Sequence, residues 1–333
     1  MIETSSGPTA LDEAPVLVHV TRGGFVESAH RATLVARDAS GATLLGAGAV
    51  DAPVLPRSCL KPVQALAMVR AGLDLPPRLL ALVCASHSGE RDHLAGVAEI
   101  LDRAGLTVAD LGNTPALPHG ELEHARWLAA GRPPEAVAQD CSGKHAGMLL
   151  TCATNGWPLE GYLDPDHPLQ RAILATVEQE CGPVSHTTVD GCGAPLFAIP
   201  LSGLAAAFGR LAGATKGERQ RVADAMRAAP EMVGGTDRDV TTLMRAVPGL
   251  VAKDGAESCY AAGTADGTGI ALKVVDGAPF ARARTVLLAT VLQAVAGGLP
   301  GLDELAVQPV LGHGRPVGEV RAVGLGDPAR AAG

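Results

Sequence analysis

The sequence of 333 residues predicts a mixed α/β fold. Two observations lead to this class: strand-like patterns occur near both ends of the chain, and helical patterns dominate between them. This order is typical of a mixed α/β lobe built from both termini, with a mostly helical lobe inserted in the middle. We expect residues 1–57 plus 213–333 to form the α/β lobe and residues 58–212 to form the helical lobe.

Strand patterns open and close the chain. The turn-forming Asp38-Ala39-Ser40-Gly41 separates two of them, which predicts a hairpin or meander at the start. The expected strands cover residues 16–21, 33–37, 43–50, 187–190, 251–253, 269–275 and 317–323. The final segment, 324–333, is expected to form a frayed tail.

Helical patterns occupy most of the chain between the strands. The expected helices cover residues 58–71, 78–84, 91–104, 121–130, 143–153, 169–181, 201–211, 218–228 and 282–296. Pro62 falls in the first turn of its helix, where a missing N–H group costs nothing. Ser58 is therefore expected at the amino end of that helix.

Charge and composition argue against several classes of protein. A net charge of −8 and an aromatic content of 2% do not suit nucleic-acid binding. No apolar window is long enough to predict a membrane span, and residues 1–15 lack the basic start and apolar run of a leader peptide. Seven cysteines, an odd number, suit a reducing compartment better than a disulfide framework. We expect a cytoplasmic protein without membrane partners.

The scarcity of lysine draws attention to one pair of residues. Only five of the 27 basic residues are lysines. Lysine, unlike arginine, can lose its proton in a desolvated site and then act as a base. Ser58 and Lys61 stand three residues apart in a predicted helix, so they share a face. We interpret Lys216 and Lys273 as ordinary solvated surface groups.

Four further segments combine reactive polar groups with glycine, which lets backbone and substrate approach closely. They are Ala85-Ser86-His87-Ser88-Gly89-Glu90, Cys141-Ser142-Gly143-Lys144-His145-Ala146-Gly147, Asp190-Gly191-Cys192-Gly193-Ala194-Pro195 and Lys253-Asp254-Gly255-Ala256-Glu257. The order Ser-x-x-Lys, Ser-x-Ser, Lys-x-Gly reproduces the layout of the serine β-lactamases and penicillin-binding enzymes.

In that layout the helix serine is the nucleophile. Ser58 would attack an amide carbonyl and pass its proton to Lys61, which accepts it only when neutral. Burial and a second ammonium nearby would lower the pKa of Lys61, and Lys253 is the candidate for that second ammonium. Backbone N–H groups at the start of the Ser58 helix, or beside the glycine of the late strand, would stabilise the oxyanion.

Taken together, the five segments around Ser58, Ser86, Lys144, Cys192 and Lys253 resemble the rhizobial-type (class 3) L-asparaginases of the asparaginase II family. The resemblance runs from about residue 16 to residue 323. It implies a serine β-lactamase-like fold, a homodimer and hydrolysis of L-asparagine to L-aspartate and ammonia.

The same resemblance implies roles for individual residues. Ser58 would be the nucleophile with Lys61 as its partner, and Ser86 with Lys253 would form a second Ser-Lys tandem. The resemblance also implies a zinc ion close to the substrate rather than performing the hydrolysis, held by Cys141, Lys144 and Cys192.

The residues alone leave the zinc site open. Cys-x-x-Lys is not a usual metal spacing, and a lysine ligand must first be deprotonated. Cys141 and Cys192 also fit the small buried hydrophobic role that free cysteines commonly take, although both lie next to glycine and polar residues. A disulfide between these two cysteines is a further alternative.

Several other residues have two interpretations. Asp190 either caps a turn or meets the α-ammonium of the substrate or a zinc-bound water. Arg57 is either a surface cation or the partner of a substrate carboxylate. His87 and His145 are either site members or hydrogen-bonded structural imidazoles, and Gly255 belongs to the expected substrate-binding set.

The sequence is also compatible with several related classes of substrate. Ser258 stands where the resemblance leads us to expect a glycine, and a larger residue there would narrow the pocket. The alternatives are another Ser-Lys amidohydrolase on the same fold (glutaminase-like, β-lactam-acylating or an esterase) or a non-catalytic zinc-binding regulator.

Overall fold

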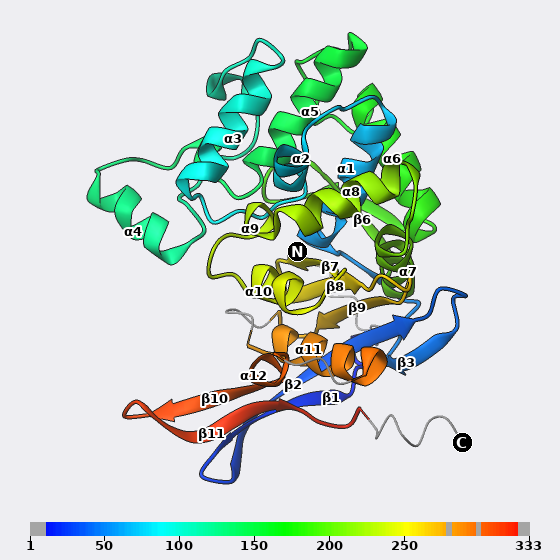
Figure 1. Cartoon of the computed structure of the whole chain (residues 1–333), viewed down its shortest axis with the longest axis vertical. Coiled ribbons are helices and arrows are strands. Elements are labelled where there is room, and N and C mark those ends of the chain that lie inside the picture. Colours follow the sequence, from blue (N-terminus) through cyan, green and yellow to red (C-terminus); the bar gives the residue numbers. More distant parts are fainter. Residues whose placement is uncertain (1–10, 278–281, 298–300, 326–333) are drawn as a thin grey trace, which may run out of the picture.

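The computed structural model describes residues 11–277, 282–297 and 301–325. It is a mixed α/β structure, as the sequence predicts. Most helices gather above one part of a long antiparallel sheet, and the hairpins of the sheet extend away from them (Figure 1). Both described ends of the chain lie in the sheet, because the first strand pairs with the last and places Val18 opposite Ala322.

One large sheet holds most of the strands. Its order is β10-β11-β1-β2-β9-β8-β7, and β3 pairs with β2 beside this path. The strands are β1 (Val16–Arg22), β2 (Phe25–Arg37), β3 (Thr43–Ala47), β7 (Val251–Gly255), β8 (Cys259–Gly263), β9 (Gly269–Val274), β10 (Val307–Gly312) and β11 (Arg315–Ala322). A smaller sheet has the order β4-β6-β5, with β4 (Pro53–Val54), β5 (His186–Val189) and β6 (Pro195–Pro200).

Helices α1 to α6 lie between β4 and β5 in the chain, as the pattern predicts. They are α1 (Lys61–Arg70), α2 (Pro77–Val83), α3 (Arg91–Asp102), α4 (Glu121–Ala129), α5 (Ser142–Asn155) and α6 (Pro168–Cys181). The remaining helices are α7 (Leu201–Ala212), α8 (Gly217–Ala228), α9 (Pro230–Val233), α10 (Asp239–Ala246), α11 (Arg284–Ala296) and α12 (Asp303–Ala306). None of the described helices is long and apolar enough to cross a membrane.

Two helices pack on the large sheet. Helix α7 packs on β2, β8 and β9, while α11 packs on β8, β9 and β11. Glycine permits the closest of these approaches, because a Cβ atom on Gly269 would lie 1.9 Å from the carbonyl oxygen of Ala205 in α7. Helix α8, which follows α7 in the chain, packs on α1 and α2.

The predicted helix at residues 58–71 is built in two pieces. Arg57–Leu60 forms a 3₁₀ turn, η1, and the α-helix begins only at Lys61. Pro62 lies in the first turn of α1, as its missing N–H requires. Ser58 therefore lies in the tight turn before the helix rather than in its first α-helical turn.

Candidate active site

A cavity of about 1290 Å³ opens where η1, β7 and the segment after α2 meet. The serines of both predicted tandems line it, as do Asp254 and Gly255 of β7. Charged side chains provide much of the remaining wall, including Asp140, Arg238, Glu257 and Arg284.

Ser58 is held in place by a strained turn. It is 8% exposed and follows Arg57, whose φ of 51° lies in the left-handed region that non-glycine residues rarely adopt. The Arg57 guanidinium donates to Oδ1 of Asp190 at 2.8 Å, and the backbone N–H of Gly191 donates to the same oxygen. The ion pair therefore ties the turn of Ser58 to the loop that carries Cys192. The two residues expected to bind substrate ions bind each other in this structure.

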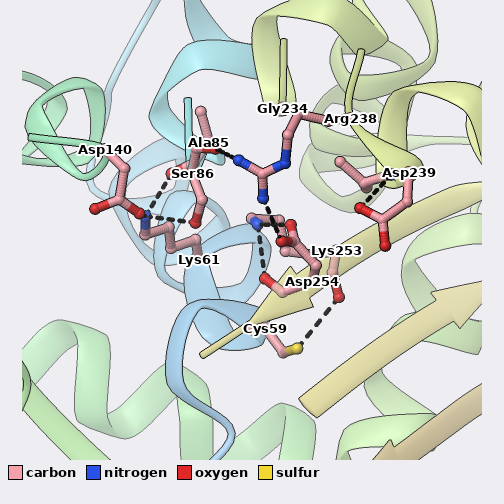
Figure 2. A network of polar contacts seen from close by, with 12 residues as sticks. Cys59, Lys61, Ala85, Ser86, Asp140, Gly234, Arg238, Asp239, Lys253 and Asp254 are labelled. Atoms are coloured by element: carbon pink, nitrogen blue, oxygen red, sulfur yellow. Dashed lines mark hydrogen bonds and ion pairs between the residues drawn. The ribbon is translucent and has the colours of Figure 1, made fainter. Parts of the chain in front are cut away.

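Lys61 points to the second serine. Its Nζ atom, on a side chain 1% exposed, donates to Oγ of Ser86 at 3.0 Å and to the carbonyl oxygen of Ala85 at 2.5 Å. A carboxylate oxygen of Asp140 lies 3.7 Å from the same nitrogen. Figure 2 shows these contacts converging on the amine.

The surroundings of Lys61 favour its charged form. Burial acts to lower its pKa, but the neighbouring Cys141 side chain and the Asp140 carboxylate outweigh burial and raise the pKa above its ordinary value. Burial also acts to raise the pKa of Asp140, and the Lys61 ammonium overcomes it and lowers that pKa to about 2. This direction is opposite to the sequence-based expectation that Lys61 would be neutral.

Lys253 has the lowered pKa instead. Its side chain is fully buried, and Nζ donates to Oδ1 of Asp254 at 2.6 Å and to the Asp254 carbonyl oxygen at 2.7 Å. Burial lowers the pKa of Lys253 most, the neighbouring Asp254 carboxylate raises it, and the Lys61 ammonium lowers it further. The net effect is a lowered pKa.

Two arginines complete the surroundings of Asp254. Arg238 donates from Nη2 to Oδ2 of Asp254 at 2.6 Å and from Nη1 to the carbonyl oxygen of Ser86 at 3.4 Å. Arg284 donates to the same carboxylate oxygen at 3.1 Å. Sequence reasoning missed both arginines, because no motif distinguishes them among the many arginines of the chain.

The three predicted zinc ligands lie together. Nζ of Lys144 lies 3.1 Å from the sulfur of Cys192, and Cys141 shares a hydrogen bond with Cys192. This hydrogen bond, followed by the Lys144 ammonium, lowers the pKa of the Cys192 thiol against the effect of burial. All seven cysteines of the chain are free, so Cys141 and Cys192 form no disulfide.

The donor set itself tests the zinc prediction. Across the described residues, no three side chains of His, Cys, Asp or Glu gather as a metal-binding group. Two thiols and one amine do converge, and sulfur and nitrogen are the donors that zinc prefers. The residues therefore fit zinc only with Lys144 as a deprotonated ligand.

The two candidate histidines are buried and neither lines the cavity. Nε2 of His87 lies 2.8 Å from Oγ of Ser142, and burial lowers the pKa of His87 well below its ordinary value. Nδ1 of His145 lies 2.8 Å from the hydroxyl of Tyr162, and burial lowers the pKa of His145 to about 4. Both imidazoles are neutral near pH 7.

The turn after β7 forms another part of the wall. A Cβ atom on Gly255 would lie 2.7 Å from the carbonyl oxygen of Pro56, so glycine lets the strand approach η1. Ser258 lines the cavity at a φ of 51° and is 3% exposed. Lys273 is half-buried and donates to the carbonyl oxygens of Glu257 and Val274, so the expectation of a solvated surface lysine is wrong there. Lys216 is exposed, as expected.

The fold and the cavity define a mixed α/β protein with a charged cleft lined by two candidate serines, one of which, Ser86, accepts a hydrogen bond from the buried Lys61. A model of the L-asparaginase II family matches residues 18–322, which is nearly the whole chain. The chain belongs to the L-asparaginase II family, and this membership implies a hydrolase that acts on amides. No curated protein matches the chain at a significant level.

Proposed function

We propose that the protein is an L-asparaginase that hydrolyses L-asparagine to L-aspartate and ammonia through an acyl-enzyme on Ser58. The family match over residues 18–322 is the observation that carries this proposal. Two observations support the mechanism: Ser58 and Ser86 line the same cavity, and Lys61 donates a hydrogen bond to Ser86.

In this mechanism Oγ of Ser58 attacks the side-chain amide carbon, and the hydroxyl proton passes to the group of serines and lysines. Backbone N–H groups beside Ser58 or Gly255 would receive the developing oxyanion. The C–N bond then breaks, and the proton returns to the leaving nitrogen to give ammonia. A water molecule hydrolyses the resulting aspartyl ester and restores the Ser58 hydroxyl.

The charges around the two lysines support a division of roles. Lys61, beside Asp140, holds the Ser86 hydroxyl as an ammonium, whereas Lys253 supplies the amine that accepts the proton. The four groups are coupled, so their titration belongs to the set rather than to one residue. The expected assignment of Lys61 as the neutral base is replaced by Lys253 in this proposal.

We extend the proposal to a zinc ion held by Cys141, Lys144 and Cys192. The support is the convergence of two sulfur atoms and one amine next to the loop of Asp190. When bound, zinc would neutralise the thiolate charge that now favours the Lys61 ammonium. Asp190 and Arg57 would keep the loop and the nucleophile turn together.

The proposal also includes a specific fold, that of the serine β-lactamases. An antiparallel sheet with helices, together with the order Ser58, Lys61, Ser86, Lys253, supports a serine β-lactamase-like fold. The homodimer follows from the resemblance alone and is proposed on that ground.

One observation favours a second candidate, a Ser-Lys hydrolase for larger acyl substrates. Pockets that bury a drug-sized ligand have volumes of roughly 300–1000 Å³. The cavity here reaches about 1290 Å³, even with Ser258 in its wall. An amide or ester larger than asparagine, or a β-lactam, would therefore also fit.

Steady-state release of ammonia from L-asparagine tests the proposal, with L-glutamine, an ester and a fluorescent penicillin as competing substrates. We expect asparagine to be hydrolysed and Ser58→Ala to remove the activity. Ser40→Ala, at an exposed turn that does not line the cavity, is the matched control. Unchanged ammonia release in Ser58→Ala would contradict the mechanism, and faster acylation by the penicillin or the ester would favour the second candidate.

A further inference from the structure

The carboxylate of Asp254, in the wall of the cavity, is surrounded by three basic side chains. Oδ1 accepts from Lys253, and Oδ2 accepts from Arg238 and Arg284. Asp254 is only 3% exposed, so water does little to separate these charges. Figure 2 shows Asp254 between Lys253 and Arg238.

The charges of this cluster balance only when one cation is neutral. Asp239 is the next carboxylate, 3.8 Å from Arg284, and it also accepts from Oγ1 of Thr285. Two carboxylates therefore face three cations, and an uncompensated buried charge is costly. Arginine does not give up its proton in proteins, whereas lysine does. Lys253 is the member of the cluster that can become neutral.

The cluster reaches the proposed catalytic groups through Arg238. The second nitrogen of its guanidinium donates to the carbonyl oxygen of Ser86, and Oγ of Ser86 accepts from Lys61. Arg238, Asp254 and both serines line the same cavity. A substitution of either Arg238 or Asp254 is therefore expected to change the electrostatic surroundings of the Lys253 amine and the position of the Ser86 backbone.

We propose that Asp254 and Arg238 are positioning residues that control the protonation of Lys253. Asp254 orients the amine through one oxygen, while Arg238, assisted by Arg284, takes up the negative charge at the other oxygen. Without the arginines, the whole carboxylate charge would act on Lys253 and keep it an ammonium. The inference rests on the proposed function, in which Lys253 is the base.

Other groups also face Lys253 and are part of its electrostatic surroundings. They come from several elements: Cys59 of η1, Lys61 of α1, Cys84 after α2, His119 before α4 and Asp140 before α5. The direction of the Lys253 pKa, lowered by burial despite Asp254, agrees with the charge argument.

The experiment measures kcat/KM for asparagine against pH and, in parallel, titrates Lys253 by carbon NMR on protein with labelled lysine. Five lysines give a spectrum that can be assigned, with Lys253→Arg identifying the signal. Asp254→Asn removes the anion, so the acidic limb and the Lys253 midpoint should move to lower pH. Arg238→Gln should move both to higher pH, by roughly one pH unit or more. Arg284→Gln should also move the acidic limb and the Lys253 midpoint to higher pH. It replaces Arg238→Gln in the test if that variant does not fold.

Arg245→Gln is the matched control, because Arg245 is in the same helix region but pairs with Glu231 at the surface. It should move neither limb nor midpoint. Shifts of the same sign in Asp254→Asn and Arg238→Gln, or no shift beyond the control, would overturn the inference and leave a merely structural role. The lysine titration needs no turnover. Opposite shifts in a chain without asparaginase activity would therefore contradict the proposed function and still support the inference.

Discussion

Nζ of Lys61 donates to Oγ of Ser86 at 3.0 Å, so the lysine of the first expected Ser-Lys pair holds the serine of the second. The lysine of the second pair, Lys253, donates to Asp254 instead. The two tandems are therefore not separate pairs in this structure. Lys61, Ser86 and Lys253 belong to one chain of contacts, which runs from Asp140 through Lys61, Ser86, Arg238 and Asp254 to Lys253.

Replacing Lys253 by arginine tests its role as a base. Arginine keeps the positive charge but cannot release a proton, so we expect kcat to fall roughly 10²- to 10⁴-fold. Lys61→Arg should also lower kcat, because a larger guanidinium at a side chain 1% exposed would not keep the bonds to Ser86 and Ala85. Lys216→Arg, at an exposed site, should have no effect. Near-normal turnover in folded Lys253→Arg would exclude it as the base.

The left-handed backbone of Arg57 gives a prediction about stability. Arg57→Ala and Arg57→Gly both remove the bond to Asp190, but only glycine adopts a φ of 51° without strain. We expect Arg57→Gly to be more stable than Arg57→Ala by about 1 kcal/mol in urea unfolding. Both variants should raise KM, because the nucleophile turn loses its tie to the Cys192 loop. Equal or reversed stabilities would argue against backbone strain at this position.

Burial of neutral His87 predicts loss of stability in acid. Its pKa in the folded protein is lowered below the ordinary value of 6.5 by burial, so the unfolded chain takes up the proton first. The free energy of unfolding should fall as pH decreases below about 6.5, by up to about 1.4 kcal/mol per pH unit for this group. His87→Gln should show a shallower slope in urea unfolding between pH 7 and pH 5. His186→Gln, at an exposed position of β5, should keep the original slope, and identical slopes in both variants would count against the prediction.

Metal analysis tests the zinc proposal. We expect about one zinc ion per chain after supplementation and much less in Cys192→Ala, because Cys192 contacts both other donors. Cys152→Ala, a buried cysteine outside this group, is the control and should retain the metal. Supplemented wild-type protein without zinc would remove the metal assignment.

The sequence predicts most helices well, and strands less completely. Apolar periodicity is strong in α6 and α7, which appear within two residues of their predicted bounds. Strand β2 begins at Phe25 rather than at the predicted residue 33. Its first part escaped prediction because these residues are largely exposed and do not alternate between apolar and polar. Strand β8 escaped prediction because Cys259–Gly263 consists mainly of small residues, although all five are buried.

In the candidate site, too, some residues could be predicted from the sequence and others could not. Motifs identify residues whose chemistry depends on neighbours in the sequence, so Ser58, Lys61, Ser86 and Lys253 were found, and both serines line one cavity. Arg238 and Arg284 contact Asp254 only because the chain folds back on β7, and an arginine in isolation gives no sign of its partner. The same limit applies to charge states, since the environments of Lys61 and Lys253 depend on Asp140 and Asp254 in three dimensions.

Trapping of the acyl-enzyme tests directly whether Ser58 is the nucleophile. Protein mixed with L-asparagine is quenched in acid within the first turnovers, digested and analysed by mass spectrometry. We predict an aspartyl ester on the peptide that contains Ser58, at Ser58 itself, and none in Ser58→Ala. Full ammonia release by Ser58→Ala, or an adduct located on Ser86 instead, would show that Ser58 is not the nucleophile.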